Sequence, residues 1–508
     1  MVGSFWAFTP AIIAIVLALV TKQVYISLFF GIFVGAMMFA GGNPLEAMYT
    51  LFEVMSEKVG ANTPIIVFLV VLGIIVVLMQ KSGGAKAYGD WAGRKIKTKS
   101  GALAATAGLG CLIFVDDYFN CLTVGSVMRP VTDKFKISRA KLAYLIDSTA
   151  APVCIIAPIS SWAAAVAGEL EGDGLMVFIS TIPFNVYAIL SIIMVFALCY
   201  FNFDFGKMKH NDFVAETTGD LHAGVETAEE SGEEVVSNPN GKVRHLVVPV
   251  VVLIFFCIAG MLYTGGFPET NLIDAFSDCD AGMSLAIGST FALIVISVYY
   301  ILTKVVSFKE ITGSFTQGFK AMVPAILILT FAWSISGIMG AKGGYLDAQA
   351  FVETNISNSS FPTFLFPAIF FILAGAIAFS TGTSWGTFGV LVPIAVTILG
   401  GSGALTLMTV SATLGGAVFG DHISPISDTT ILASAGANCN HVDHVNTQLP
   451  YAGLVAGVGV VAYLVGGACT SLGSVASCLI MWATALAVFV GAVVLIKYLS
   501  ARNAAKND

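Results

Sequence analysis

Residues 420–430 read Gly-Asp-His-Ile-Ser-Pro-Ile-Ser-Asp-Thr-Thr, which places two carboxylates, a histidine and a proline at the end of an otherwise apolar segment. A charged side chain in a membrane segment is costly unless it is paired, coordinated or protonated, so Asp421 and Asp428 are functional candidates by default. Hydroxyls and carbonyls that are freed where a helix unwinds can replace the water around an alkali cation. The stretch therefore predicts a broken membrane helix with an ion site at the break.

The composition of the whole chain supports a membrane location. Of 508 residues, 57% are hydrophobic and 11% are charged, and the mean hydropathy is +0.88. The apolar runs have the length that a helix needs to cross a bilayer, which predicts an all-α polytopic membrane protein in contact with lipid and excludes a β-barrel. The net charge of −7 disfavours a nucleic-acid partner.

Positive charges indicate which loops face the cytoplasm. Residues 81–100 and 128–141 are both rich in Lys and Arg, so both loops are expected in the cytoplasm. The 101–127 segment between them is too short to cross the membrane twice. We therefore expect a re-entrant hairpin, with Phe114-Val-Asp-Asp-Tyr-Phe-Asn120 at its tip, because irregular backbone is tolerated where protein or water surrounds it.

If 101–127 is a re-entrant hairpin, the remaining apolar runs predict about eleven transmembrane helices and a second re-entrant element at 361–400. The N-terminus then lies outside the cell inner (plasma) membrane, and the acidic linker 202–245 and the C-terminus lie in the cytoplasm. All Lys and Arg except Lys58 and Lys342 face the cytoplasm, whereas the outer loops 169–175 and 264–281 contain only acids. The predicted spans are 5–21, 24–40, 64–80, 142–168, 176–200, 246–263, 283–302, 322–340, 405–430, 450–468 and 478–498.

The chain also contains a weak internal repeat. Four short matches recur in the same order at separations of 257 to 267 residues; one pairs Pro158-Ile-Ser-Ser161 with Pro425-Ile-Ser-Asp428. The first copy, 24–170, enters the membrane from inside and the second, 282–435, from outside, so the repeats are inverted. Inverted repeats with broken helices are typical of alternating-access transporters. The remaining units are an N-terminal helix at 1–23, connecting helices within 176–263 and C-terminal helices at 450–498.

The candidate site consists of polar residues at four helix breaks, 116–120 and 147–162 in the first copy and 380–385 and 421–430 in the second. Na⁺ is the predicted coupling ion, held at Asp117, Asp428, Ser427 and Thr381. Further residues for ion binding or proton coupling are Asp116, Asn120, Asp147, Asp421, His422 and Thr429. Expected around a substrate cavity are Ser160, Ser161, Trp162, Thr383, Ser384 and Trp385, with Thr381 beside them.

Plainer roles stay open for several of these residues. Asp116 or Asp117 can cap a half-helix, and Asp147 can pair with Arg139 or with a backbone group. His422 can carry a proton or serve as a structural histidine, and the two tryptophans can simply pack. The segment with His441, Asp443 and His444 is expected in a short cytoplasmic loop after Gly436, and it lacks a second pair of ligands, which disfavours zinc.

The stretch Gly420–Thr430, together with His441-Val-Asp-His-Val-Asn-Thr-Gln-Leu-Pro450, resembles the NhaC family of sodium/proton antiporters. The resemblance extends over about residues 10–498 and excludes the acidic linker. It implies a sodium-dependent secondary transporter with inverted repeats, an elevator-like or rocking movement, and a homodimer. The family also includes exchangers of organic acids and transporters of amino acids, so the resemblance leaves the cargo open.

The sequence thus predicts a Na⁺/H⁺ antiporter in which one buried carboxylate, foremost Asp428 or Asp117, binds either Na⁺ or a proton. The alternative is Na⁺-coupled transport or exchange of an amino acid or small carboxylate, and a channel is a distant third. The chain has no P-loop and no HExxH or GxSxG motif, so we expect neither enzymatic activity nor a cofactor besides the coupling ion.

Overall fold

The computed structural model describes residues 2–507 except 22, 171–173, 202, 226–237, 272–274, 276–278, 340–344, 349, 352–361, 401–402 and 426. Every regular element in this described part of the chain is a helix, as predicted. Eight of the described helices are long and apolar enough to cross a membrane, or up to ten if each of two bent pairs is one span. The protein is therefore a multi-pass membrane protein.

The helices of the first half include α1 to α7. They are α1 (Thr9–Thr21), α2 (Val24–Phe39), α3 (Pro44–Ala61), α4 (Thr63–Lys81), α5 (Gly84–Lys95), α6 (Lys99–Leu112) and α7 (Asp117–Lys134). Next come α8 (Arg139–Asp147), α9 (Ala151–Cys154), α10 (Ser161–Ala167), α11 (Gly174–Thr181), α12 (Val186–Phe201) and α13 (Gly206–Thr218). Short 3-10 turns at Phe5–Phe8 and Ile182–Phe184 complete this half.

The second half runs from α14 to α24. Its helices are α14 (Arg244–Thr264), α16 (Ala281–Leu302), α17 (Phe308–Met339), α19 (Phe366–Thr381), α20 (Ser384–Leu399), α21 (Ala404–Ile423), α22 (Asp428–Ala437), α23 (His441–Ala468) and α24 (Ser474–Asn507). The 3-10 turns Thr363–Leu365 and Thr470–Leu472 precede α19 and α24.

The segment 142–168, predicted as one transmembrane helix, is three short helices instead: α8, α9 and α10. Proline explains part of the break, because Pro152 and Pro158 have no backbone N–H to donate. A new helix then starts where the Ser160 hydroxyl accepts a hydrogen bond from Ala163 N at 3.0 Å. The segment 405–430 is likewise divided, into α21 and α22. Both interruptions lie at polar stretches that the sequence had marked as breaks.

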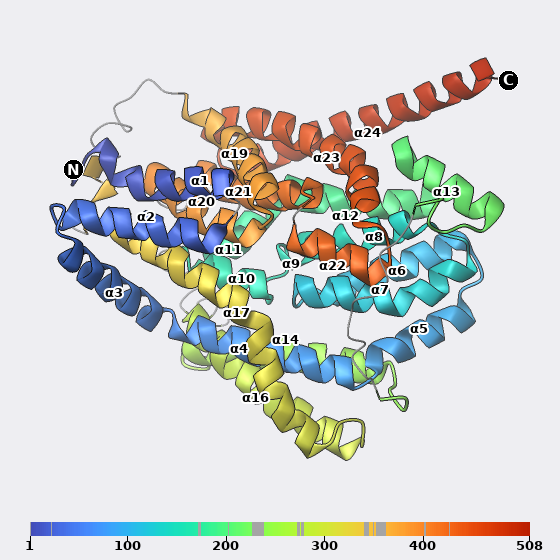
Figure 1. Ribbon diagram of the computed structural model, residues 1–508, viewed down its shortest axis with the longest axis horizontal. Helices are drawn as coiled ribbons and strands as arrows, with labels where there is room; N and C mark the ends of the chain where they lie inside the picture. Colours follow the sequence, from blue (N-terminus) through green and yellow to red (C-terminus); the bar gives the residue numbers. More distant parts are fainter. Residues whose placement is uncertain are drawn as a thin grey trace.

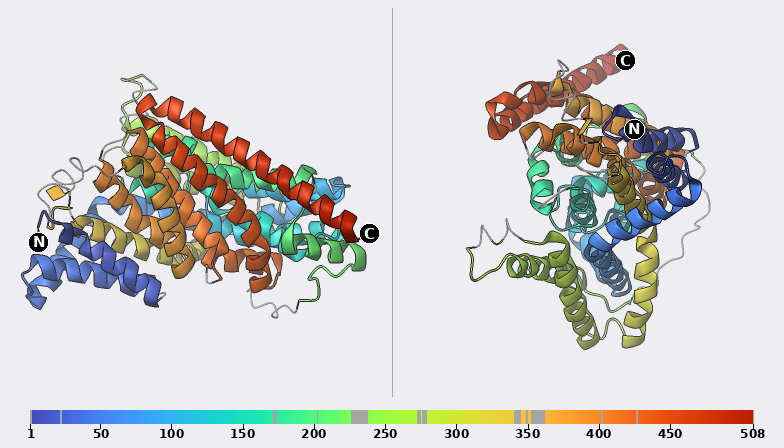
Figure 2. Two further views of the ribbon diagram at one scale, coloured as in Figure 1. Left: turned by 90° about the horizontal axis from the view of Figure 1, so that it is seen from above. Right: turned by 90° about the vertical axis from the view of Figure 1, so that its left-hand side faces the viewer.

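The helices pack into two apolar clusters. The smaller cluster joins α1, α2, α3 and the end of α17, while the larger one contains most of the other helices. In Figure 1, α1 to α3 lie with the N-terminus at one end of the molecule, and α5, α13 and the C-terminus lie at the other. Figure 2 shows α24 running along the outside of the molecule. We call the end with α5 and α13 the basic end, after Lys86, Arg94, Lys95, Lys99, Lys134 and Lys136.

Helices α6 and α7 form a pair whose outer ends both reach the basic end. Lys99 Nζ, at the start of α6, lies 2.5 Å from Asp212 Oδ2 of α13. Lys136, just after α7, donates from Nζ to Glu216 O of the same helix at 3.4 Å. This arrangement is that of a hairpin, but its depth in a membrane and the division of the chain into inverted repeats remain predictions.

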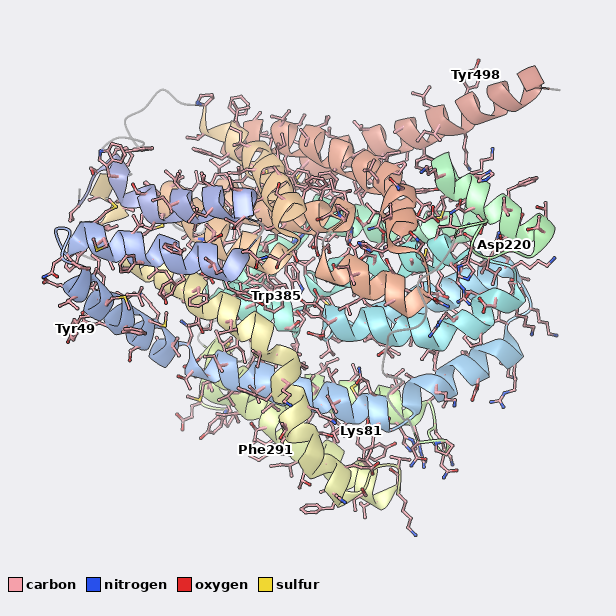
Figure 3. The ribbon with its side chains drawn as sticks, in the orientation of Figure 1. Tyr49, Lys81, Asp220, Phe291, Trp385 and Tyr498 are labelled. Carbon is pink, nitrogen blue, oxygen red and sulfur yellow. The ribbon has the colours of Figure 1, made fainter. Side chains whose placement is uncertain are left out.

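A second helix pair, α19 and α20, turns at Gly382. Its φ of +69° is left-handed, which favours glycine. Thr383 Oγ1 then accepts from Gly386 N at 3.3 Å and caps α20. Trp385, one residue into α20, lies near the middle of the molecule, between Tyr49 at one end and Asp220 at the other (Figure 3).

Candidate functional site

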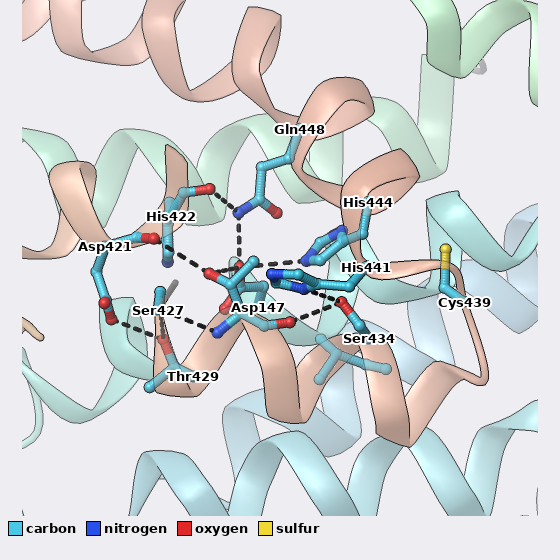
Figure 4. Close-up of polar contacts among 12 residues, drawn as sticks. Asp147, Asp421, His422, Ser427, Thr429, Ser434, Cys439, His441, His444 and Gln448 are labelled. Carbon is cyan, nitrogen blue, oxygen red and sulfur yellow. Dashed lines mark hydrogen bonds and ion pairs between the residues drawn. The ribbon is translucent and has the colours of Figure 1, made fainter. Parts of the chain in front are cut away.

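A buried polar cluster forms where α8 and α21 end and α22 and α23 begin. Asp147 is the last residue of α8, and Asp421 lies in the last turn of α21. Figure 4 shows Asp147 beside His444 and Gln448 of α23, and the side chain of Asp421 directed toward Thr429 in the first turn of α22. Asp147 is 1% exposed and Asp421 is 0% exposed, so the tertiary structure removes two carboxylates from solvent in one place.

Asp147 is held by polar side chains of the second half of the chain. Its Oδ2 accepts from Gln448 Nε2 at 2.6 Å and from Thr430 Oγ1 at 3.2 Å. His444 Nε2 lies 3.4 Å from the same oxygen, which is close enough for an ion pair when the ring is protonated but lacks hydrogen-bond geometry. Asp147 does not pair with Arg139, which instead binds Asp133 at 2.9 Å.

Gln448 links Asp147 to the end of α21. Its Nε2 has two hydrogens, and besides Asp147 it donates to His422 O at 2.7 Å. The His422 ring bonds on its other side, where Nδ1 lies 2.9 Å from the Tyr187 hydroxyl. Three helices, α8, α21 and α23, are thereby joined through one amide group.

Asp421 is surrounded by hydroxyl groups. Its Oδ2 accepts from Thr429 Oγ1 at 2.7 Å and from Ser384 Oγ at 3.4 Å. Thr430 Oγ1 also lies 3.1 Å from Asp421 O. Because a hydroxyl has one hydrogen, Thr430 donates either to Asp147 or to Asp421 O, and so it connects the two carboxylate-bearing residues.

Three buried side-chain oxygens near this cluster accept no hydrogen bond from any described residue. They are Asp147 Oδ1, Gln448 Oε1 and Asn120 Oδ1. An unsatisfied buried acceptor costs about 1–3 kcal/mol, and such groups call for a ligand, a water or an ion. Oxygen acceptors of this kind suit a hard cation that sheds its water.

The tip between α6 and α7 contributes the polar residues of the first half. Asp116 and Asp117 are buried, and Asp117 Oδ2 accepts from Trp162 Nε1 at 2.9 Å. Asn120 Nδ2 donates toward Gly110 O, Ile113 O and Thr149 O at 2.7 to 3.1 Å. Asp117 is the first residue of α7, and its Oδ1 accepts from Tyr118 N at 3.1 Å. Asp117 therefore lies at a helix start and also in the buried polar region.

Trp162 and Trp385, separated by more than two hundred residues, meet in space. Their ring centroids are 5.7 Å apart, and Phe388 lies 5.1 Å from Trp162 and 5.7 Å from Trp385. Both tryptophans are almost completely buried. The rings thus pack on one another between the starts of α10 and α20.

The remaining hydroxyl candidates have mostly structural partners. Ser160 Oγ caps α10 and donates to Cys154 O at 2.8 Å, while Thr381 Oγ1 donates within α19 to Ile377 O at 2.9 Å. Ser161 is buried and its backbone N–H donates to Val115 O at 2.9 Å. Ser427 caps α22 through Thr430 N at 3.1 Å. The side chain of Asp428, the foremost sequence candidate together with Asp117, lies outside the described part of the structure.

Sequence reasoning did not include His444, Gln448 and Tyr187 among the site residues. His444 was placed in a loop outside the membrane, but it lies in the first turn of α23 and is fully buried. The available signal was the spacing of His444 and Gln448, four residues apart and therefore on one helix face. Tyr187 carried no such signal, because a tyrosine in an apolar helix is ordinarily a packing residue.

The described residues contain no group of three or more His, Cys, Asp or Glu side chains arranged to hold a metal ion. His441 instead bonds to protein groups: its Nδ1 lies 3.1 Å from Ser434 Oγ and its Nε2 lies 2.8 Å from Pro425 O. The ring joins the start of α23 to α22 and to the turn before α22.

Comparison with known proteins identifies relatives with this architecture. The chain is 40% identical to a Haemophilus influenzae protein described as uncharacterized, over 92% of this chain and 91% of that protein. It is 31% identical to the malate-2H⁺/Na⁺-lactate antiporter of Bacillus subtilis, over 28% of this chain and 30% of that protein. The solved YdaH transporter of Alcanivorax borkumensis has a similar fold, with a TM-score of 0.53 at 14% identity, covering 84% of this chain and 89% of that chain.

The family comparison matches residues 163–468 to the Na⁺/H⁺ antiporter family. The matched range contains Asp421, His444 and Gln448, whereas Asp147 comes from the part of the chain before it. This match covers more than half of the chain and agrees with the resemblance carried by residues 420–450. The protein is a transporter that belongs to the Na⁺/H⁺ antiporter family.

Proposed function

We propose that the protein exchanges Na⁺ for H⁺ by alternating access, with Asp147 and Asp421 at the shared ion site. The observation that carries this proposal is Asp147 Oδ1, a fully buried carboxylate oxygen with no hydrogen-bond partner among the described residues. A carboxylate inside a membrane protein must be compensated by a proton or a cation. Asp147 therefore has a coordination position to offer to either ion.

The surrounding groups provide a suitable set of oxygen ligands for Na⁺. Thr430 contributes a hydroxyl oxygen next to Asp147 and also bonds Asp421 O, while Thr429 in the same turn bonds the Asp421 carboxylate. Gln448 Oε1 adds an amide oxygen that accepts no hydrogen bond from the described chain. Alkali cations are selected by such oxygens when they replace the hydration shell.

Competition at this site couples the two ions. When Na⁺ occupies the carboxylates they remain ionised, and when Na⁺ leaves, a proton neutralises the same oxygens. If the protein changes conformation only with the site occupied, each cycle exchanges the two ions across the membrane. The proposal moves the central role from Asp428 or Asp117 to the Asp147 and Asp421 pair.

The test uses purified protein in liposomes that enclose a pH-sensitive dye. An inward Na⁺ gradient should alkalinise the lumen with wild-type protein, and Asp147→Asn and Asp421→Asn should abolish the change. Asp443→Asn is the matched control. The Asp443 carboxylate accepts from Asn211 Nδ2 at 2.7 Å and does not bond Asp147 or Asp421. The proposal fails if wild-type protein shows no Na⁺-dependent pH change, or if Asp147→Asn exchanges normally.

A second candidate is Na⁺-coupled exchange of a small carboxylate. It is favoured by the relative named a malate-2H⁺/Na⁺-lactate antiporter and by the buried ring cluster of Trp162, Trp385 and Phe388, which offers an organic solute more contact than an ion needs. An amino acid is a related possibility for the same place. Radioactive Na⁺ uptake that requires malate, lactate or an amino acid on the other side would support this candidate over simple Na⁺/H⁺ exchange.

We also propose the sidedness and assembly of the protein. The basic end faces the cytoplasm of the plasma membrane, since positive loops are retained there, and the N-terminus lies outside. The family resemblance favours a homodimer. Labelling of single cysteines at exposed Lys95 and Glu269 with a membrane-impermeant reagent in intact cells should modify position 269 and spare position 95.

A further inference from the structure

Glu169 is a buried acid that the exchange site does not use. It lies two residues after the end of α10, and its backbone N–H donates to Val166 O at 3.0 Å. A Cβ atom built on Gly168 would lie 3.0 Å from Ile65 and 3.1 Å from the Trp333 ring, while one on Gly389 would lie 3.8 Å from Glu169 Oε1. The carboxyl group is thus enclosed near the end of α10, where that helix meets α4 and α20 and where α17 packs on both of them.

Neither carboxylate oxygen of Glu169 has a hydrogen-bond partner among the described residues, although the residue is only 8% exposed. No Lys, Arg or His of the described chain forms an ion pair with it. The carbonyl groups at the end of α10 add negative potential at this position. An isolated anion buried in such surroundings costs several kcal/mol, which a proton removes.

Few charged residues lie near Glu169 on the neighbouring elements, and those of α17 (Lys309, Glu310 and Lys320) lie in its first half, away from Trp333. The residues of α10, α11 and α20 include no Asp, Glu, Lys, Arg or His, and the charged residue of α4, Lys81, lies at its basic end. The titratable groups at this end of the remaining neighbours are Asp280, which caps α16 through Met283 N at 2.9 Å, and Lys58 of α3, which packs on Gly337 of α17.

The same surroundings argue against Na⁺ as the ligand. The side chains placed against this region are Ile65, Ala332 and Trp333, and the packed position on α20 is Gly389. None of these side chains supplies an oxygen atom, so an alkali cation, which needs several oxygen ligands, would find few besides the carboxylate and the carbonyl groups at the end of α10. A proton needs only one of the two carboxylate oxygens.

We propose that Glu169 is a second proton-binding site of the transporter, located between α10, α17 and α20 on the side away from the basic end. This inference deepens the proposed antiport, on which its role in coupling rests. In the conformation described here the acid is protonated and lets the apolar surfaces close around it. When α20 separates from α17, water reaches Glu169, and its O–H bond breaks to leave a carboxylate and release the proton to water.

Two features of the surroundings fit a carboxyl group that alternates between a protonated and an ionised state. The indole N–H of Trp333, beside Gly168, has no acceptor among the described residues, so a donor stands ready when the carboxyl group ionises. Gly389 and Ala332 pack closely, since a Cβ on Gly389 would lie 2.9 Å from Ala332 Cβ. A close α17–α20 contact of this kind can exclude water in one conformation and admit it in another.

The first experiment tests the protonation state without any transport. Infrared spectra of purified protein at neutral pH should show a carboxylic-acid carbonyl band that is absent in Glu169→Gln and present in Glu269→Gln, an exposed acid at the same end. Glu169→Gln should fold with unchanged or raised thermal stability, because it replaces a neutral acid with a neutral amide. Identical spectra for wild type and Glu169→Gln would overturn the proposal.

The second experiment separates proton coupling from Na⁺ binding in liposomes. Glu169→Gln should retain exchange of radioactive Na⁺ for Na⁺, whereas Na⁺-driven pH change should fall roughly tenfold or more; Glu169→Asp should restore part of it. Equal loss of both activities, or retention of both, would contradict the role in coupling. If wild-type protein itself does not exchange Na⁺, the proposed antiport fails, while the infrared result still decides whether Glu169 binds a proton.

Discussion

Gly125 of α7 and Gly436 of α22 pack backbone against backbone. A Cβ atom built on Gly125 would lie 2.3 Å from the carbonyl carbon of Gly436, a distance that real Cβ atoms do not adopt. The two glycines let α22 lie directly on α7 and reach the end of α8, where Thr430 bonds Asp147. The ion site therefore depends on two residues that carry no polar side chain.

Gly125→Ala should destabilise the protein and distort the site. The added methyl group meets backbone atoms that cannot rotate away, and overpacking of this kind costs about 1–3 kcal/mol. The melting temperature of the purified protein and its Na⁺-dependent transport should both fall. Gly453→Ala is the matched control, because a Cβ at this α23 glycine meets nothing within 4 Å; equal effects of the two variants would refute the close packing.

Gln448→Leu should impair ion binding more than folding. It removes the donors to Asp147 Oδ2 and to His422 O and leaves both acceptors buried. A loss of about 1–3 kcal/mol corresponds to a roughly 5- to 150-fold weaker apparent Na⁺ affinity, measured by uptake of radioactive Na⁺. Thr409→Val, which removes a hydroxyl that bonds only within α21 to Leu405 O, should leave the affinity unchanged.

Trp162→Phe should reduce transport because it removes one hydrogen-bond donor to Asp117. Its indole N–H binds Asp117 Oδ2 at 2.9 Å, and a phenyl ring keeps most of the packing with Trp385 but cannot donate. We expect transport to fall about tenfold, the equivalent of one charged hydrogen bond. Trp482 of α24 makes a comparable hydrogen bond from its indole N–H to Pro183 O at 2.7 Å. Trp482→Phe removes this bond and should leave transport normal. A similar loss in both variants would indicate a general packing effect.

Lys141→Met should release α13 from the body of the protein. Lys141 is fully buried at the start of α8 and binds Asp204 at 2.8 Å and Asp212 at 3.2 Å. Removing the cation leaves Asp204 without its ion-pair partner, while Asp212 keeps Lys99, and an uncompensated buried charge of this kind costs about 3–5 kcal/mol. Hydrogen–deuterium exchange in α13 should rise.

Two further variants check this interpretation of Lys141. Asp204→Asn in the Lys141→Met background should lower the exchange of α13 again, because the unpaired charge is gone. Lys497→Met, which loses ring contacts with Phe201 and Phe203 at about 5 Å, should change the exchange little. Unchanged exchange in Lys141→Met would show that the ion pairs do not hold α13.

The apolar runs were sufficient to predict the fold class, and the family resemblance of residues 420–450 agrees with the family match. The number of spans was less predictable, because hydropathy measures how apolar a segment is and does not detect where its backbone breaks. Residues 142–168 show this: they are apolar enough on average to be predicted as one span, yet prolines and a capping serine divide them into three helices. His444 was expected in a short loop before a span at 450–468, but α23 already begins at His441.

The sequence alone determined that the chain is an all-helical membrane protein with acidic breaks, because hydrophobic length and intramembrane charge are local properties of a segment. The tertiary structure decided which of these helix breaks bring their polar side chains into contact. It joined Asp147 to Thr430, His444 and Gln448, which lie roughly 300 residues away in the chain, and it enclosed Glu169 without a partner. Such proximity depends on which helices can approach closely, and contacts between distant glycines such as Gly125 and Gly436 set that approach.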